Sequence, residues 1–355
     1  MNKRTWLIVM MGVALLGGCS SSEPEVTLTI EEPLHWTFDP GMIFPADRSL
    51  HRAEDGVALP DGRLIVVDQI DGLRLIETDG SSRPFGKLHE AGYRHDPPAF
   101  AGGPNGINLT PSGTHVLVSD VFQGGIYRVE ISTEATERIH EHEFGVNSTR
   151  ADSHGGIWFS QSTRNEPENG EANLFRSVAV PVPDGTVFYL PPGGAGEPVV
   201  VIDGLHFSNG IALDESAGLL YVSETMRSQV WRVEVDVTTG TVRGKSRFID
   251  VDHPDNLELD HRGQLWIASP IRNEISVFDP ITGTTESVFR ISTPESEAQL
   301  AAIGERQAAN ASWLDLFTPP LWEPAPGPIT GMIVSPNDGP VYATGLGNAL
   351  IRLDR

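Results

Sequence analysis

One pattern recurs six times along the chain and constrains its fold more than any other feature. Each copy begins with a polar or turn-forming residue and continues into a short apolar strand that ends in a small or acidic residue. Alternation with a period of two, bounded by Asp-Gly, Ser-Gly and Pro-Asn turns, predicts antiparallel strands. Self-similarity at intervals of roughly 40 to 75 residues predicts propeller blades. The sequence therefore predicts an all-β fold, a six-bladed β-propeller with four strands in each blade.

Two segments interrupt the repeats. Residues 163–171 are polar and turn-rich, and they predict a loop between blades three and four. Residues 293–328 combine a helical pattern over Ser296 to Ala309 with a proline-rich end, and we interpret them as a helical and Pro-rich insertion between blades five and six. Its apolar residues either cover a pocket or, as we favour, pack beneath the propeller face: Trp313, Leu314, Phe317 and Trp322.

The first residues form a targeting segment. Lys3 and Arg4 precede an apolar run from Trp6 to Leu16, which is too short to span a bilayer as a mature helix. The small-residue cleavage site Leu16-Gly17-Gly18-Cys19 resembles a bacterial lipobox. The resemblance implies cleavage before Cys19 and lipidation of its thiol, and an ordinary cleaved signal peptide is the alternative.

The lipobox resemblance also implies a domain organisation and a location. Residues 1–18 would be the lipoprotein signal peptide, residues 19–35 the lipidated cysteine and its tether, and residues 36–355 the propeller. Ser20, in place of an aspartate after the cysteine, resembles the outer-membrane pattern of Gram-negative lipoproteins. We therefore expect a protein of the cell envelope, anchored to the outer membrane and facing the periplasm.

The composition excludes several kinds of site and partner. Cys19 is the only cysteine, so the predicted propeller has no disulfide, no thiol nucleophile and no cysteine metal site. The histidines do not pair at the spacing typical of zinc ligands. A formal net charge of −23 argues against nucleic acid as a partner and is compatible with cation binding. No Gly-x-Ser-x-Gly motif supports a serine hydrolase.

Polar side chains stand at the same point of four repeats. The inner strand of each propeller blade starts near the central channel, so equivalent positions converge there although they are distant in sequence. Two carboxylates and two amides at one point would repel without a cation, and Ca²⁺ accepts about six to eight oxygen ligands in flexible geometry. We therefore predict bound Ca²⁺, with another divalent cation as the alternative. The four residues are Glu54, Asn147, Asn209 and Asp255.

The repeats around two of these positions resemble a known family. Ser208-Asn209-Gly210-Ile211 and Pro254-Asp255-Asn256-Leu257, each with the strand that follows it, are similar to the senescence-marker-protein/gluconolactonase (SMP-30/gluconolactonase/LRE-like) family. Paraoxonases and strictosidine-synthase-like proteins are related to it. The resemblance extends over residues 50–355 and is strongest over residues 205–270. It implies a six-bladed propeller with a catalytic calcium in its channel, held here by Glu54, Asn147, Asn209 and Asp255, with Asn256 as a fifth ligand.

The chain also departs from its paraoxonase-like relatives. Asn105 stands where these proteins have the first histidine of a catalytic pair, and we predict that Asn105 and Asn147 contact substrate. Asp55 matches an acid that serves a second, structural calcium in that branch. Ser148 stands where the other acid of that site is expected, so the choice between one and two metal ions stays open.

These residues predict a calcium-dependent hydrolase of lactones or esters, in which water attacks a metal-polarised carbonyl group. Asp255 is the leading candidate for the general base, and His253 and His206 are further candidates. The expected partners are a small-molecule lactone or ester and, through the anchor, a membrane; a closed propeller predicts a monomer.

Two other functions stay open. One is a non-enzymatic propeller that binds a ligand or a protein in the periplasm, because fold alone does not establish an activity. The other is a strictosidine-synthase-like condensing enzyme, which would need a glutamate to hold an amine, with Glu224 as its candidate.

Overall fold

The computed structural model describes residues 34–194 and 196–355, and every structural statement below concerns these residues. The predicted signal peptide, Cys19 and nearly all of the tether lie outside the described residues. Among the described helices, none has both the length and the apolar character needed to span a membrane.

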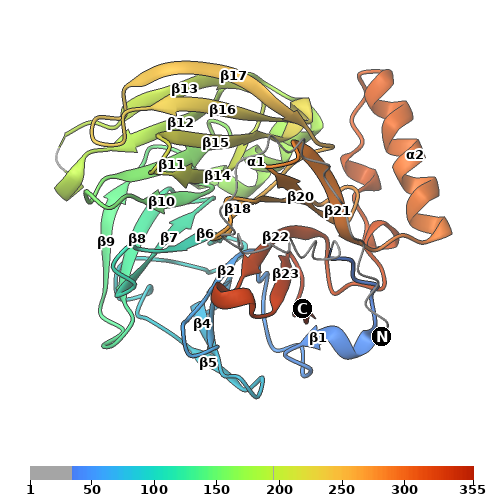
Figure 1. The fold of residues 1–355 in the computed structure, drawn as a ribbon, viewed down its shortest axis with the longest axis horizontal. Helices are drawn as coiled ribbons and strands as arrows, with labels where there is room; N and C mark the ends of the chain where they lie inside the picture. The colour runs from blue at the N-terminus through green and yellow to red at the C-terminus, as the bar shows by residue number, and fades with distance from the viewer. Residues whose placement is uncertain (1–33, 195) are drawn as a thin grey trace, which may run out of the picture. The chain divides into compact units, whose positions relative to one another are not determined.

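The described residues form a six-bladed β-propeller, which confirms the predicted fold (Figure 1). Each of the six sheets has four strands, and neighbouring strands run antiparallel. The first three blades contain β2 (Gly56–Ala58), β3 (Leu64–Asp68), β4 (Gly72–Ile76) and β5 (Ser82–Pro84); β6 (Pro104–Leu109), β7 (His115–Asp120), β8 (Gly125–Glu130) and β9 (Thr136–Glu141); and β10 (Thr149–Ala151), β11 (Ile157–Gln161), β12 (Gly185–Leu190) and β13 (Val199–Leu205). The last three contain β14 (Ser208–Asp214), β15 (Leu219–Glu224), β16 (Gln229–Val235) and β17 (Val242–Asp250); β18 (Leu257–Leu259), β19 (Leu265–Ser269), β20 (Glu274–Asp279) and β21 (Thr284–Arg290); and β22 (Ile329–Val334), β23 (Val341–Gly345), β24 (Leu350–Leu353) and β1 (Ile43–Phe44).

The ring of blades closes through both its innermost and its outermost strands. Each inner strand contacts the inner strand of the next blade, and the last of these contacts joins β22 to β2. At the outer edge, β1 completes the sixth blade by pairing with β24, with Ile43 opposite Ile351 and Phe44 opposite Leu350. The start of the described chain is thereby joined to its end, and a closed ring leaves no blade free to rotate away from the channel.

The core of the propeller lies between the blades. Strands buried on both faces are continuously apolar, as in Leu64-Ile65-Val66-Val67 of β3, and they present a packing surface to each neighbouring blade. Six apolar clusters fill the six interfaces between successive blades, counting the interface between the sixth and the first. Trp158 and Trp266 are fully buried in two of them. Side-chain packing thus fills every interface between blades, and hydrogen bonds such as that from the Gly106 amide to the Asn147 carbonyl add to it near the inner strands.

The two α-helices of the described residues stand outside the six sheets (Figure 1). Helix α2 (Pro294–Ala308) lies in the predicted insertion between blades five and six, followed by the short 3-10 helices η5 (Leu314–Leu316) and η6 (Pro319–Leu321). A capping box begins α2: the Thr293 hydroxyl accepts from the Ser296 amide, and the Ser296 hydroxyl accepts from the Thr293 amide.

The prediction of a simple loop over residues 163–171 was wrong. The segment contains the 3-10 helix η2 (Pro167–Asn169) and leads into helix α1 (Gly170–Ala179). It connects β11 to β12, which are neighbours in one sheet, so it is an insertion within blade three rather than a link between blades three and four. The polar residues of its first part concealed the helix, although Leu174 and Val178 are four residues apart, as on one face of a helix.

Closure of the ring gives a test of stability. Ile351 on β24 is buried, faces Ile43, and belongs to the cluster between the last two blades. We expect Ile351→Ala to lower the free energy of unfolding by about 2 to 5 kcal/mol. The matched control is Ile281→Ala, because Ile281 is 91% exposed in a turn and should change stability by less than about 0.5 kcal/mol. Denaturant unfolding of both variants checks this, and equal midpoints would contradict the role given to the closure.

Candidate active site

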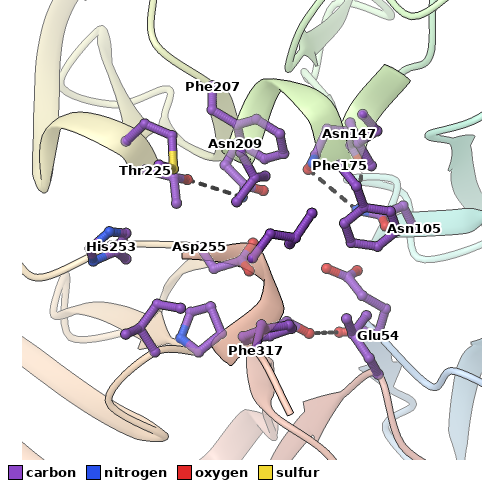
Figure 2. Close-up of a pocket in the computed structure, with 18 of the residues that line it drawn as sticks. Glu54, Asn105, Asn147, Phe175, Phe207, Asn209, Thr225, His253, Asp255 and Phe317 are labelled. Carbon is purple, nitrogen blue, oxygen red and sulfur yellow. Dashed lines mark hydrogen bonds between the residues drawn. The ribbon is translucent and has the colours of Figure 1, made fainter. Parts of the chain in front are cut away.

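One pocket opens over the ends of the inner strands, and most of the predicted site residues line it (Figure 2). Its volume is about 710 Å³, including the part open to solvent, which suits a small-molecule ligand. The residues are far apart in sequence and meet because each lies at or just before an inner strand of its blade. The predicted residues that line the pocket are Glu54, Asn105, Asn147, Asn209, His253 and Asp255.

Irregular strand starts present some of these side chains to the pocket. The pairing of β6 with β7 shifts register between Pro104 and Ile107, and that of β14 with β15 shifts between Ser208 and Ile211. Asn105 and Asn209 lie within these two irregular stretches. Such bulges bend a strand and redirect a side chain, and they are frequent beside functional sites. The regular alternation of the strand therefore does not decide where these two asparagines point.

The Asn-Gly pairs at these positions are not turns, because both lie inside strands. A Cβ atom on Gly210 would stand 2.5 Å from the Cα of Asn256 and 2.6 Å from the carbonyl oxygen of Asp255. A Cβ atom on Gly106 would stand 2.7 Å from the Cα of Ser148. Glycine is needed at both places so that neighbouring inner strands approach closely. That approach brings Asn209 next to Asp255.

Two oxygen atoms in the pocket are buried without a hydrogen-bond donor. Glu54 accepts a hydrogen bond at Oε1 from the Asn256 amide, at 3.2 Å, whereas its Oε2 has no partner. Asn209 donates through Nδ2 to Thr225 at 3.1 Å, whereas its Oδ1 has no partner. The carboxylates of Glu54 and Asp255 and the amide of Asn209 turn toward the same part of the pocket (Figure 2). Leaving buried acceptors unpaired costs about 1 to 3 kcal/mol each, so the arrangement favours a positively charged ligand.

Burial also raises the pKa of the acids in and beside the pocket. Desolvation, and secondly the charge of Asp255, hold the pKa of Glu54 well above its usual range. Desolvation raises the pKa of Asp255 to about 8, although Arg52 opposes the shift. Both shifts favour the protonated form of the carboxyl group in the metal-free protein. A divalent cation would displace those protons on binding.

Arg52 belongs to the pocket, and the sequence analysis did not identify it. Arg48 and Arg52 both have a left-handed backbone, with φ of 53° and 55°. Of these two arginines, Arg52 lines the pocket. Its guanidinium donates to the Pro104 carbonyl at 3.0 Å and to Asn105 Oδ1 at 2.7 Å. Asn105 in turn donates to Asn147 Oδ1 at 3.3 Å. A chain of hydrogen bonds thus runs along one side of the pocket from a cation to two amides.

The two histidines occupy different places. His253 lines the pocket, with Nδ1 2.6 Å from Asp252 and Nε2 2.7 Å from Nε2 of Gln307 on α2. Because the amide nitrogen of Gln307 can only donate, His253 Nε2 accepts and its Nδ1 carries the proton that bonds Asp252. Neither nitrogen of His253 is then free to take a proton from water.

His206 and Glu224 lie away from the pocket lining. His206 Nδ1 is 3.1 Å from Glu224, and its Nε2 is 3.0 Å from Arg227. Glu224 also accepts hydrogen bonds from Gln229 and Trp231. The carboxylate of Glu224 is therefore occupied by its own blade, which gives no support to an amine-binding role. Of the three candidate bases, Asp255 has the most favourable position.

Asn256 and Asp55 support the site from outside the pocket lining. Asn256 presents its amide nitrogen to Glu54 and so orients that carboxylate. Asp55 accepts hydrogen bonds from the Gly56 and Ile107 amides, at 2.8 and 3.1 Å. Burial raises the pKa of Asp55 to about 7, and the positive charge of Arg150 acts against that shift. A guanidinium thus supplies positive charge beside Asp55, in the part of the channel where a second ion was considered.

The donor set fits a hard cation held by carboxylate and neutral amide oxygens together. Within residues 34–194 and 196–355, no group of three or more His, Cys, Asp or Glu side chains could hold a metal ion. The pocket instead combines two carboxylates, Glu54 and Asp255, with the amide oxygens of asparagines, and two of its oxygens have no other partner. Carboxylate and amide oxygens are the ligands that Ca²⁺ prefers.

Comparison with a family model supports the resemblance found in the sequence. The model for the SMP-30/Gluconolactonase/LRE-like region matches residues 135–308 and confirms the resemblance to this family over that segment. The matched segment contains Asn147, Asn209 and Asp255, whereas Glu54 and Arg52 precede it.

Two curated relatives are similar in sequence. The putative sugar lactone lactonase YvrE of Bacillus subtilis (strain 168) is 26% identical over 194 residues, which are 52% of this chain and 60% of that protein. The adipocyte plasma membrane-associated protein of Salmo salar is 25% identical over 288 residues, which are 71% of this chain and 66% of that protein. The chain thus matches less than two thirds of the length of either relative.

Solved structures share the fold at low sequence identity. A gluconolactonase from Xanthomonas campestris superposes with a TM-score of 0.58 at 17% identity, covering 92% of this chain and 95% of that one. A putative gluconolactonase gives a TM-score of 0.56 at 19% identity, covering 88% and 96% of the two chains. A luciferin-regenerating enzyme gives 0.54 at 14% identity, covering 84% and 86%. At these sequence identities, the similarity shows that the propeller fold is shared.

The raised pKa values give a prediction for the metal-free protein. Asp255 and Asp55 have folded-state pKa values of about 8 and 7, against an ordinary 3.8, so folding favours their protonated forms. The stability that the two protonated carboxyl groups contribute is fully present below their unfolded-state pKa. It is lost as pH rises through their folded-state pKa values of about 7 and 8. In the presence of a chelator, the melting temperature of the native protein should be lower at about pH 9 than at about pH 6. The decrease should be smaller in Asp255→Asn.

Thermal unfolding at the two pH values checks this expectation. The matched control is Asp203→Asn, because Asp203 is exposed on β13 and should leave the native pH dependence unchanged. If Asp255→Asn loses as much stability with rising pH as the native protein does, the buried Asp255 carboxyl is not the group responsible.

Proposed function

We propose, from the match of residues 135–308 to the SMP-30/Gluconolactonase/LRE-like region and from the pocket, that the protein is a metal-dependent hydrolase of lactones or related esters. The bacterial relative is named as a putative sugar lactone lactonase, and the resemblance to the family over residues 135–308 supports lactone hydrolysis as the general activity. Calcium is the metal that the oxygen ligands suit best. The metal and the mechanism are our inference from the pocket.

One observation carries the proposal. Glu54 Oε2 and Asn209 Oδ1 are buried at the pocket without donors, next to the Asp255 carboxylate. A cation held by Glu54, Asn209 and Asp255, with Asn147 as a further ligand, would satisfy both oxygens and balance both charges. When bound, calcium would act as a Lewis acid on the substrate carbonyl and stabilise the charge that develops on its oxygen.

The side chains around this position have separate tasks in the proposed reaction. Asp255 accepts a proton from the water that attacks the carbonyl carbon. The ester C–O bond then breaks, and the departing oxygen takes up a proton to give a hydroxy acid. Arg52 holds Asn105, and Asn105 holds Asn147, so this side of the pocket keeps a fixed position while substrate binds. Asn256 orients Glu54 in the same way.

The lipobox resemblance at Cys19 supports a location of the protein at the cell envelope. That part of the proposal concerns residues outside the described range and stays a prediction. A binding propeller without catalysis remains the alternative function, and turnover measurements separate the two.

Activity and metal binding give the test of this function. We expect the protein to hydrolyse members of a panel of aldonolactones, alkyl lactones and aryl esters. A chelator should abolish this hydrolysis, and added calcium should restore it. Asp255→Asn and Glu54→Gln should each weaken calcium binding, measured by calorimetry, by at least about tenfold, because each removes a charge from the ligand set.

The matched controls are Asp203→Asn and Glu90→Gln, which change exposed acids and should bind calcium as the native protein does. Folded, calcium-loaded protein that hydrolyses no member of the panel would favour the binding propeller. Native calcium affinity in both site variants would refute the proposed ligands.

A further inference from the structure

The pocket has a polar floor and an apolar wall. The floor is the ring of carboxylates and amides described above. The wall comes largely from two segments outside the propeller sheets, the helix α1 and the insertion after α2. Phe175, Val178, Leu314 and Phe317 are only partly buried, so their apolar surface faces the space that a ligand would fill. The wall residues from these two segments are Leu174, Phe175, Val178, Trp313, Leu314 and Phe317.

The two segments form one continuous wall. Leu174 packs with Val121, Phe122 and Phe207 in one apolar cluster. Trp313 packs with Ile271, Ile303 and Leu321 in a second cluster. Val178 and Met226 pack against both clusters and so join them. The wall is therefore part of a packed structure and not a set of isolated exposed side chains.

The position of α1 is fixed by the polar residues at its start. Asn165 donates to the Val121 carbonyl at 2.8 Å and to the Gly170 carbonyl at 3.1 Å. Gly170 itself lies so close to Phe122 that a Cβ atom would stand 2.2 Å from the Phe122 carbonyl oxygen. Phe175 is thereby carried on a helix that is anchored to the second blade.

Polar groups near the wall already have partners. Thr225 accepts from Asn209 and donates to the Pro254 carbonyl at 2.7 Å. Both ring nitrogens of His253 are engaged, by Asp252 and by Gln307. Arg52 uses both terminal nitrogens on Pro104 and Asn105. A substrate with many hydroxyl groups would find few partners here and would lose those it had in water.

We propose that this site takes lactones or esters with an apolar alkyl or aryl substituent, in preference to polyhydroxylated sugar lactones. The inference rests on the proposed hydrolase function and adds its substrate class. The reacting carbonyl lies at the polar floor, and the substituent lies along Phe175 and Phe317. Burial of the substituent against this wall supplies the binding free energy that sugar hydroxyl groups would supply in a polar pocket.

The test compares lactones that differ in the length of their apolar substituent with one polyhydroxylated sugar lactone. We would measure kcat/KM of the full-length, calcium-loaded protein for γ-lactones with methyl, butyl and heptyl substituents, and for gluconolactone. The value should rise with chain length by up to about fourfold for each methylene that reaches the wall. All three alkyl lactones should be hydrolysed more efficiently than gluconolactone, and the reverse order would overturn the proposal.

Variants of the wall test its residues. Phe175→Ser and Phe317→Ser should each lower kcat/KM for the heptyl lactone by roughly tenfold and lower it less for the methyl lactone, so that the dependence on chain length is reduced. Val180→Ser is the matched control, because Val180 follows α1, is 62% exposed and does not line the pocket, so it should keep the native dependence on chain length. Native dependence in both wall variants would also overturn the proposal. Circular dichroism confirms that each variant is folded.

Binding separates failure of this inference from failure of the hydrolase function. If no lactone is hydrolysed, the proposed function is wrong, and the same lactones then serve as binding probes through the fluorescence of Trp313 and the other tryptophans. Affinity that rises with chain length and is lost in Phe175→Ser would still support an apolar ligand. Affinity independent of chain length would exclude it.

Discussion

Contact between neighbouring inner strands is the constraint on which the rest of the structure depends. These strands form a closed circle, from β2 through β22 and back to β2. The close approach requires glycine where one strand passes the backbone of the next, as Gly210 passes Asn256. It also forces the polar residues at the strand ends together. The packing that closes the propeller and the geometry that assembles the pocket are therefore one arrangement.

That arrangement has an electrostatic cost. Burial raises the pKa of both Glu54 and Asp255, the charge of Asp255 adds to the shift at Glu54, and Arg52 is the nearby positive charge that opposes both shifts. Arg52 is already engaged by Pro104 and Asn105, and Glu54 and Asn209 retain oxygens without donors. The simplest compensation is a divalent cation. The buried carboxylates and unpaired oxygens that cause this cost would make the site selective for a hard cation.

The sequence predicted the repeating parts of this structure and the helical insertion between blades five and six, and it missed other parts that occur once. Six similar strand patterns predicted six blades, and equivalent repeat starts predicted that Glu54, Asn147, Asn209 and Asp255 converge. Arg52 carries no repeat signal, and its role depends on a left-handed backbone that sequence patterns do not reveal. Helix α1 was overlooked because its polar start resembles a loop, although Phe175 and Val178 follow helical spacing. The insertion was expected mainly to pack, whereas Trp313 and Phe317 also line the pocket.

The most direct test of the account is a crystal structure of the protein grown with calcium, with the ion located by its anomalous scattering. We predict one ion in the pocket, about 2.3 to 2.6 Å from Glu54 Oε2, Asn209 Oδ1 and the Asp255 carboxylate. No ion beside Asp55 is expected, because Arg150 supplies positive charge there. A structure in which calcium is absent from the pocket, and in which protein groups pair the free oxygens of Glu54 and Asn209, would contradict the account.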